Sequence, residues 1–170
     1  CVVDKSVLVT GAGGSIGSEL CRQILRRDPK IIVLFEMTES ALFYIEQELI
    51  DRAKRLAADV QIVAVLGSVL DAKRLKDTLY THNVGTVFHA AAYKHVPMLE
   101  SNKIEGVRNN IFGTKTVVDA CSSSGVDSLV VVSTDKAVRP TNLMGATKRF
   151  AELVVQATIS SSTKMNTCMV

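Results

Sequence analysis

The sequence has little of what marks a membrane, secreted or nucleic-acid-binding protein. No apolar run approaches the roughly 20 residues needed to cross a bilayer, and Asp4 and Lys5 interrupt the apolar stretch that a signal peptide needs. Lys and Arg number 20 against 17 Asp and Glu, without a basic stripe, so nucleic-acid binding has little support. The four cysteines form no CxxC pair and the three histidines no ligand cluster. This predicts free thiols in a reducing, cytoplasmic compartment and no metal site.

What the sequence does have is a repeated alternation of two kinds of segment. Short β-branched runs, apolar throughout, predict parallel strands covered on both faces at residues 6–9, 31–35, 61–66, 85–89 and 128–133. Apolar spacing between them predicts helices over residues 16–25, from Thr38 onward, and over residues 72–81, 100–123 and 142–160. This order predicts right-handed βαβ crossovers and a doubly wound α/β sheet. With 170 residues, 47% of them hydrophobic, the chain fits one globular domain.

A glycine-rich loop joins the first predicted strand to the first predicted helix. The pattern Thr-Gly-x-x-Gly-x-x-Gly runs from Thr10 to Gly17. Such a loop needs glycine for the sharp turn off the strand, for close approach of a pyrophosphate, and for tight packing of the helix on the sheet. Free N–H groups at the helix start then point at the phosphates. The context predicts a Rossmann dinucleotide site formed by Gly11, Gly13, Gly14, Ser15, Ile16 and Gly17.

Glu36 ends the second predicted strand, about twenty residues past the loop, where an acid bonds both hydroxyls of the adenosine ribose. A carboxylate there repels a 2′-phosphate, and no Arg or Lys follows it immediately. NAD is therefore favoured over NADP as the cofactor. The alternative is that Glu36 only caps the next helix.

The end of the sequence predicts an incomplete sheet. A polar break at residues 160–163 precedes residues 165–170, which read as the opening of another strand. An enzyme with such a sheet continues past this point. We therefore interpret residues 1–170 as a Rossmann fragment, truncated before a C-terminal substrate-binding part.

Three further blocks carry a family resemblance. They are HAAAYKHVP at residues 89–97, STDKAV at residues 133–138 and PTNLMGATKR at residues 140–149. With the glycine loop, they resemble the nucleotide-sugar 4,6-dehydratases of bacterial polysaccharide biosynthesis. These are extended short-chain dehydrogenases of the capsule and O-antigen type that act on UDP-N-acetylglucosamine. The resemblance runs from Val7 to about Leu153.

The resemblance implies where a nicotinamide dinucleotide and its partners bind. An asparagine in the region of Asn109 is implied to support the active site through backbone contacts, and Lys94 and His95 either face the UDP-sugar or lie on a solvated loop. The family also implies a UDP-N-acetylhexosamine substrate, a homo-oligomer assembled through the last two long helices, and anchoring of full-length relatives at the cytoplasmic face of the inner membrane. Beyond the glycine loop and Glu36, the implied cofactor residues are Ser68, Val69, Ala90, Ala91, Ala92 and Lys148.

The resemblance also implies the catalytic residues. Dehydration requires oxidation at C4, removal of the C5 proton, departure of the C6 hydroxyl and return of the hydride to C6. Lys136 matches the base at C5 and Asp135 the acid at C6, or these roles are exchanged; a plain salt bridge is the alternative. Thr134, or the serine before it, takes the usual serine position at the C4 oxygen. Lys148 is the usual lysine, but Met144 stands where most relatives have tyrosine, as in the long, membrane-anchored branch.

Two other functions remain open at this point. A UDP-sugar 4-epimerase shares the fold and the cofactor, but it depends on the tyrosine that Met144 replaces and has no use for an elimination pair. A non-catalytic dinucleotide-binding module is compatible with Met144 and with an incomplete chain.

Overall fold

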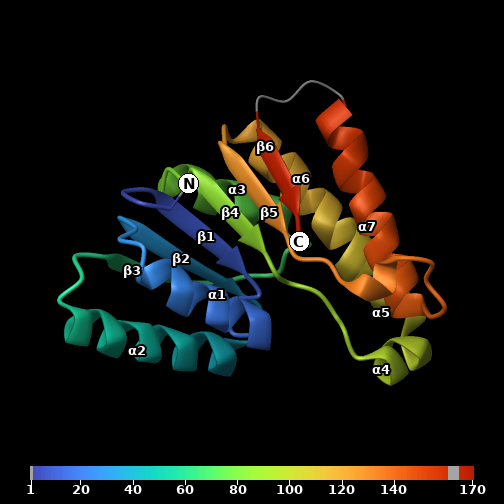
Figure 1. The fold of residues 1–170 in the computed structure, drawn as a ribbon, viewed down its shortest axis with the longest axis horizontal. Helices are drawn as coiled ribbons and strands as arrows, with labels where there is room; N and C mark the ends of the chain where they lie inside the picture. The colour runs from blue at the N-terminus through green and yellow to red at the C-terminus, as the bar shows by residue number, and fades with distance from the viewer. Residues whose placement is uncertain (1, 161–164) are drawn as a thin grey trace.

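Six parallel strands form one sheet at the centre of the molecule, in the order β3-β2-β1-β4-β5-β6 (Figure 1). The computed structural model describes residues 2–160 and 165–170. The strands are β1 Ser6–Thr10, β2 Ile31–Glu36, β3 Gln61–Leu66, β4 Thr86–His89, β5 Ser128–Val131 and β6 Asn166–Met169. This is the strand order of the doubly wound dinucleotide-binding fold, as the alternation of segments predicted.

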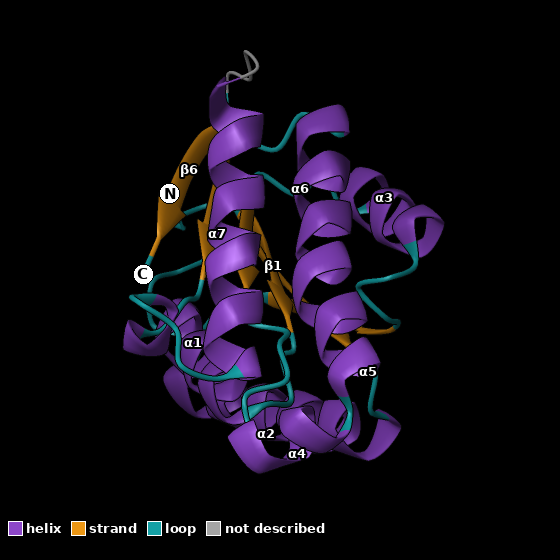
Figure 2. Ribbon diagram, turned by 90° about the vertical axis from the view of Figure 1, so that its right-hand side faces the viewer, coloured by secondary structure: helices purple, strands orange, loops and turns teal. Residues whose placement is uncertain are grey.

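Helices cover both faces of the sheet (Figures 1 and 2). Their bounds are α1 Ser15–Leu25, α2 Glu39–Leu56, α3 Ala72–Thr81, α4 Val96–Ser101, α5 Lys103–Val107, the π-turn η1 Arg108–Phe112, α6 Gly113–Ser123, the 3-10 turn η2 Asp135–Ala137 and α7 Leu143–Ser160.

The strands are apolar throughout because successive side chains enter two separate cores. Val7, Val9 and Leu34 lie in the core under α1 and α2. Leu8 and Val33 lie in the core that α3, α6 and α7 cover. Side chains from both cores are fully buried, which pins the register of the central strands and fixes where each carboxyl end emerges.

The prediction of one helix over residues 100–123 is wrong. Asn102 separates α4 from α5, and its side-chain amide donates to the Met98 carbonyl at 2.9 Å, closing α4. The π-turn η1 then precedes α6. A π-turn inside a helix is rare and is frequent at functional sites. Apolar spacing could not reveal the break at Asn102, because a side-chain amide produces it.

The other predicted elements differ from the structure only at their ends. β5 stops at Val131, two residues short of the prediction, although the N–H of Val132 still donates to the His89 carbonyl at 3.0 Å. The strand predicted at residues 165–170 is confirmed as β6. Residues 161–163 of the predicted polar break lie outside the described residues. Across the part of the chain that the structure describes, no helix is both long and apolar enough to cross a membrane.

Candidate functional site

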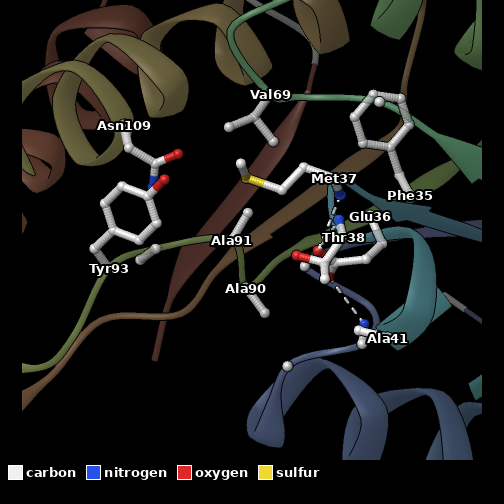
Figure 3. A pocket seen from close by; sticks show the side chains of 15 residues that line it. Phe35, Glu36, Met37, Thr38, Ala41, Val69, Ala90, Ala91, Tyr93 and Asn109 are labelled. Atoms are coloured by element: carbon white, nitrogen blue, oxygen red, sulfur yellow. Dashed lines mark hydrogen bonds between the residues drawn. The ribbon is translucent and has the colours of Figure 1, made fainter. Parts of the chain in front are cut away.

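A cavity of about 320 Å³ opens at the carboxyl ends of β1, β2 and β4. Strand order reverses between β1 and β4, and ligands of open α/β sheets bind in the crevice at such a point. In Figure 3, Glu36 and Thr38 lie at one end of the cavity, Tyr93 and Asn109 at the other, and Ala91 between them. The lining residues are Gly11, Gly13, Gly14, Phe35, Glu36, Met37, Thr38, Ala41, Gly67, Val69, Ala90, Ala91, Ala92, Tyr93 and Asn109.

The glycine loop forms the cavity wall below α1. Gly11 has a φ of +65°, a conformation that a side chain would strain. A Cβ on Gly17 would lie 2.0 Å from the Gly11 carbonyl oxygen, so only glycine lets α1 pack this closely on the loop. The helix begins after Gly14 without a side-chain cap. Its first N–H groups have no intrahelical acceptor and are available to an anion.

The Glu36 carboxylate ties the glycine loop to the turn after β2. One oxygen, Oε2, accepts from the Gly13 N–H at 3.1 Å, and Oε1 accepts from the N–H groups of Met37 and Thr38 at 2.9 and 3.0 Å. The N-cap residue of α2 is Thr38, so the Glu36 carboxylate bonds the turn directly before the helix and not the N–H groups of the helix itself. A carboxylate offers about four acceptor positions, so three N–H bonds leave about one for a ligand hydroxyl. Glu36 can therefore accept from both ribose hydroxyls, as expected, only if it gives up one of its three backbone N–H bonds.

The cavity contains some of the predicted cofactor residues and omits others. Ser68 lies outside the lining, where its hydroxyl accepts from the Leu70 N–H at 3.2 Å; its neighbours Gly67 and Val69 line the cavity instead. Of the residues predicted from the glycine loop onward, the lining omits Ser15, Ile16, Gly17, Ser68 and Lys148 and contains Gly11, Gly13, Gly14, Glu36, Val69, Ala90, Ala91 and Ala92.

A buried hydrogen-bonded chain supports the floor of this cavity, and sequence reasoning missed it. The two ring nitrogens of His89 contact the hydroxyls of Thr10 at 2.7 Å and Thr114 at 3.0 Å. Thr114 already donates to the Asn110 carbonyl at 2.7 Å, so it accepts from Nε2–H of His89, and Thr10 donates to Nδ1. The Ala91 N–H in turn donates to the Thr10 hydroxyl at 3.3 Å. Burial, with a smaller contribution from the Lys148 charge, lowers the pKa of His89 to about 3, so the ring is neutral.

The asparagine that contacts the backbone of the loop after β4 is Asn110, one residue past the expected Asn109. Its amide oxygen accepts from the Tyr93 N–H at 2.8 Å, and its amide nitrogen donates to the Tyr93 carbonyl at 2.9 Å. The same nitrogen donates to the Thr147 hydroxyl on α7 at 3.0 Å. The π-turn η1 presents this side chain, so Asn110 joins the loop after β4 to α7. Asn109 lines the cavity.

Thr134, Asp135 and Lys136 follow β5, the neighbour of β4 in the sheet. The Thr134 hydroxyl donates to Asp135 Oδ1 at 3.0 Å, and Lys136 Nζ donates to the same oxygen at 3.4 Å. The hydrogen bond from Thr134, followed by that from Lys136, lowers the pKa of the Asp135 carboxyl. Both charged side chains are exposed, so this ion pair stabilises the fold little and is free to meet a ligand.

Met144 and Lys148 lie one turn apart on α7, the helix that packs against η2. Both are buried, with 4% and 9% of their surfaces exposed. Lys148 Nζ donates to the Val132 carbonyl at 2.5 Å, and burial lowers the pKa of Lys148. Met144 offers no exchangeable proton at the position where a tyrosine was expected. One of the three N–H donors of the Lys148 ammonium is used in this bond, and Lys148 does not line the cavity.

Lys94 lies outside the lining of this cavity and reaches the start of α1. Its Nζ donates to the hydroxyl of Ser15, the first residue of α1. A cation at the positive end of a helix dipole is unfavourable unless an anion lies between them. Lys94 and the uncapped start of α1 therefore converge on a position that suits a diphosphate.

Comparison with known proteins identifies the family and its relatives. The model of the family described as "Polysaccharide biosynthesis protein" matches residues 7–170. The capsular polysaccharide biosynthesis protein CapD of Staphylococcus aureus is 44% identical over 163 residues, which cover 96% of this chain and 27% of CapD. The UDP-N-acetylglucosamine 4,6-dehydratase (inverting) of Campylobacter jejuni is 36% identical over 85% of this chain and 40% of that enzyme. UDP-glucose 4-epimerases of Rickettsia species also match.

Among solved structures, MoeE5 in complex with UDP-glucuronic acid and NAD superimposes with a TM-score of 0.79 at 25% identity. The superposition covers 96% of this chain and 53% of that one. The chain thus spans between about a quarter and about half of the length of the proteins that it matches.

Proposed function

Because the chain belongs to the polysaccharide biosynthesis protein family, we propose that it is the dinucleotide-binding domain of a nucleotide-sugar 4,6-dehydratase that acts on a UDP-N-acetylhexosamine. One observation carries the proposal. The Asp135–Lys136 ion pair follows β5, and the 320 Å³ cavity opens at the carboxyl ends of β1, β2 and β4. Neither residue lines the cavity, but the strands are parallel, so both features lie at the same edge of the sheet. An elimination pair beside a cofactor cavity is what dehydration requires and what a simple dehydrogenase has no use for.

NAD fits the cavity on three independent features. The uncapped start of α1 and Lys94 suit a pyrophosphate, Glu36 suits an unphosphorylated ribose, and Ala90 and Ala91 leave room along β4. Lys148 would hold the nicotinamide ribose. When bound, NAD supplies a hydride acceptor for C4 and a hydride donor for C6, so it is regenerated in each turnover.

Asp135 and Lys136 supply the proton transfers of the elimination. In the proposed order, Lys136 removes the C5 proton and Asp135 protonates the departing C6 hydroxyl. Transfer of one proton from Lys136 Nζ to Asp135 Oδ1, 3.4 Å apart, prepares both groups for these roles. A bound sugar that excludes water favours this neutral pair, because burial penalises the charged forms. If the roles are exchanged, ionised Asp135 is the base at C5 and the Lys136 ammonium is the acid at C6, and no proton transfer is needed first. The geometry supports either assignment.

Thr134 takes over the proton at the C4 hydroxyl, because methionine cannot exchange one. Its hydroxyl donates to Asp135 Oδ1 at 3.0 Å. In the proposed order Asp135 already holds the Lys136 proton, so the C4 proton passes through Thr134 to solvent. Met144 itself is buried, with 4% of its surface exposed. A positioned acid–base group of this kind contributes about 10²- to 10⁴-fold to rate.

The relatives that are 4-epimerases give the second candidate function its support. An epimerase needs the same cavity and Lys148. It also needs a residue that exchanges a proton at position 144, where this chain has methionine. Epimerisation includes no elimination, so it would not use the Asp135–Lys136 pair. Met144 and the Asp135–Lys136 pair therefore favour dehydration. Assembly into a homo-oligomer through α6 and α7, and a cytoplasmic location for the full-length protein, complete the proposal; the free thiols of Cys21 and Cys121 suit a reducing compartment.

The full-length protein incubated with UDP-N-acetylglucosamine in deuterated water tests the proposal. Dehydration predicts a product lighter by one water that carries solvent deuterium at C5. An isomer of unchanged mass would support the epimerase instead, and no turnover with intact NAD binding would support a non-catalytic module. The 170-residue chain alone is expected to bind NAD weakly without turnover.

A further inference from the structure

Helix α7 holds the segment after β5 at two points, one helical turn apart. Lys148 Nζ donates to the Val132 carbonyl at 2.5 Å, and Glu152 Oε1 accepts from the Ser133 hydroxyl at 2.6 Å. Residues four apart on a helix lie on the same face, so Lys148 and Glu152 approach the strand end together. Val132 and Ser133 directly precede Thr134, the first residue of the proposed catalytic segment.

The Glu152 carboxylate is held more firmly than a surface ion pair. Only 17% of its side chain is exposed, and its second oxygen accepts from the Arg149 guanidinium at 2.9 Å. On the other side, the Ser133 N–H donates to the Val170 carbonyl after β6 at 2.5 Å. A contact between Arg149 and Glu152 alone would only stabilise α7. The bond to Ser133 joins α7 to a different element, 19 residues away in the chain.

Glu152 also acts on the charge of its helix neighbour. Burial lowers the pKa of Lys148, and the Glu152 carboxylate opposes that shift. Burial raises the pKa of Glu152, but the hydrogen bonds from Ser133 and Arg149, together with the charges of Arg149 and Lys148, outweigh it and lower the pKa overall. Glu152 is therefore ionised at neutral pH and compensates the buried ammonium.

We propose that Glu152 is a positioning residue of the site, which orients the Thr134–Lys136 segment through Ser133 and, one helical turn from Lys148, balances the charge of that buried side chain. The proposal rests on the proposed function, because the roles of Lys148 and of the segment come from it. Glu152 touches neither the cavity nor the ion pair, so it acts only through these two neighbours.

Lysine NMR on the chain described here, labelled at Cε, tests the electrostatic part without substrate. The Lys148 resonance is identified by its loss in Lys148→Met. Glu152→Gln keeps an oxygen for Ser133 but removes the charge, so the Lys148 titration midpoint should fall by about one pH unit. Glu46→Gln on α2 is the matched control and should leave that midpoint unchanged. Equal midpoints in Glu152→Gln and the control would overturn the proposal.

Hydrogen exchange tests the positioning part with a second variant. Ser133→Ala removes the hydroxyl and leaves both charges on α7, so the Lys148 midpoint should stay near its original value. Amides of residues 134–138 should exchange about 10-fold faster, the loss expected for one hydrogen bond to a carboxylate. Unchanged exchange there would contradict the proposal. In the full-length enzyme, Glu152→Gln should move the alkaline limb of kcat to lower pH, whereas Ser133→Ala should lower kcat without moving it. If no variant or parent turns over a nucleotide sugar, the proposed function fails while the two measurements on the chain still decide the role of Glu152.

Discussion

Replacing Glu36 by Gln tests how the cavity selects its dinucleotide. The carboxylate accepts three backbone N–H bonds with two oxygens. An amide has one oxygen, so at best it keeps the two bonds from Met37 and Thr38 and turns its NH₂ toward the Gly13 N–H. At least one charge-assisted hydrogen bond is lost and one buried donor is left without an acceptor. A bond of this kind contributes about 1.5–3 kcal/mol.

The same substitution should weaken NAD binding and relax the discrimination against NADP. The ribose loses its carboxylate acceptor, which corresponds to about a 10-fold or larger rise in Kd for NAD. The 2′-phosphate of NADP loses a repelling charge, so its Kd should fall or stay constant. Calorimetric titration with both dinucleotides measures the ratio, and thermal unfolding measures the stability loss of about 2 kcal/mol. Glu39→Gln, on the exposed first turn of α2, is the control. A ratio of the two Kd values equal to that of the parent would refute the role given to Glu36.

Three further predictions concern other parts of the site. Gly17→Ala places a Cβ 2.0 Å from the Gly11 oxygen and should destabilise the domain by about 1–3 kcal/mol and abolish NAD binding, whereas Gly14→Ala, at 3.2 Å from the same oxygen, should be milder in urea unfolding and titration. In the full-length enzyme, Met144→Leu should keep kcat within a few-fold, while Thr134→Val should lower it by about 10²-fold or more; equal losses would show that Met144 has a chemical role. Because His89 is neutral when folded and binds a proton near pH 6.5 when unfolded, stability should fall as the pH drops from about 6.5 toward 3. Between pH 6.5 and 5, above the range in which carboxylates titrate, His89→Asn should reduce the dependence of the free energy of unfolding on pH, measured by urea unfolding. An unchanged pH dependence would contradict the neutral state of His89 in the folded protein.

The sheet and the cavity could be predicted from the sequence because both depend on local pattern. Apolar runs such as residues 31–35 predict strands that are buried on both faces of a sheet. The glycine loop from Gly11 to Gly17, between a strand and a helix, is typical of a pyrophosphate site. These signals lie within a few residues of one another, and the fold places them where general rules for α/β sheets expect.

What the sequence could not reveal depends on side chains that meet across long separations. Asn110 contacts Tyr93 from 17 residues away, and His89 contacts Thr10 from 79 residues away. Neither pairing has a periodic signature. The split of the expected helix at Asn102 has the same origin, since an amide bonded to a carbonyl competes with the helix. Ser68 was expected at the cavity because of its place after a strand, but its hydroxyl serves the local turn instead.

Transfer of a label within the substrate tests the central claim most directly, that this domain serves a 4,6-dehydratase. The full-length protein is incubated with UDP-N-acetylglucosamine that carries deuterium at C4, and the product is examined by NMR and mass spectrometry. The account predicts a product that has lost one water and carries the C4 deuterium at C6. Deuterium retained at C4 of an isomer with unchanged mass would contradict it.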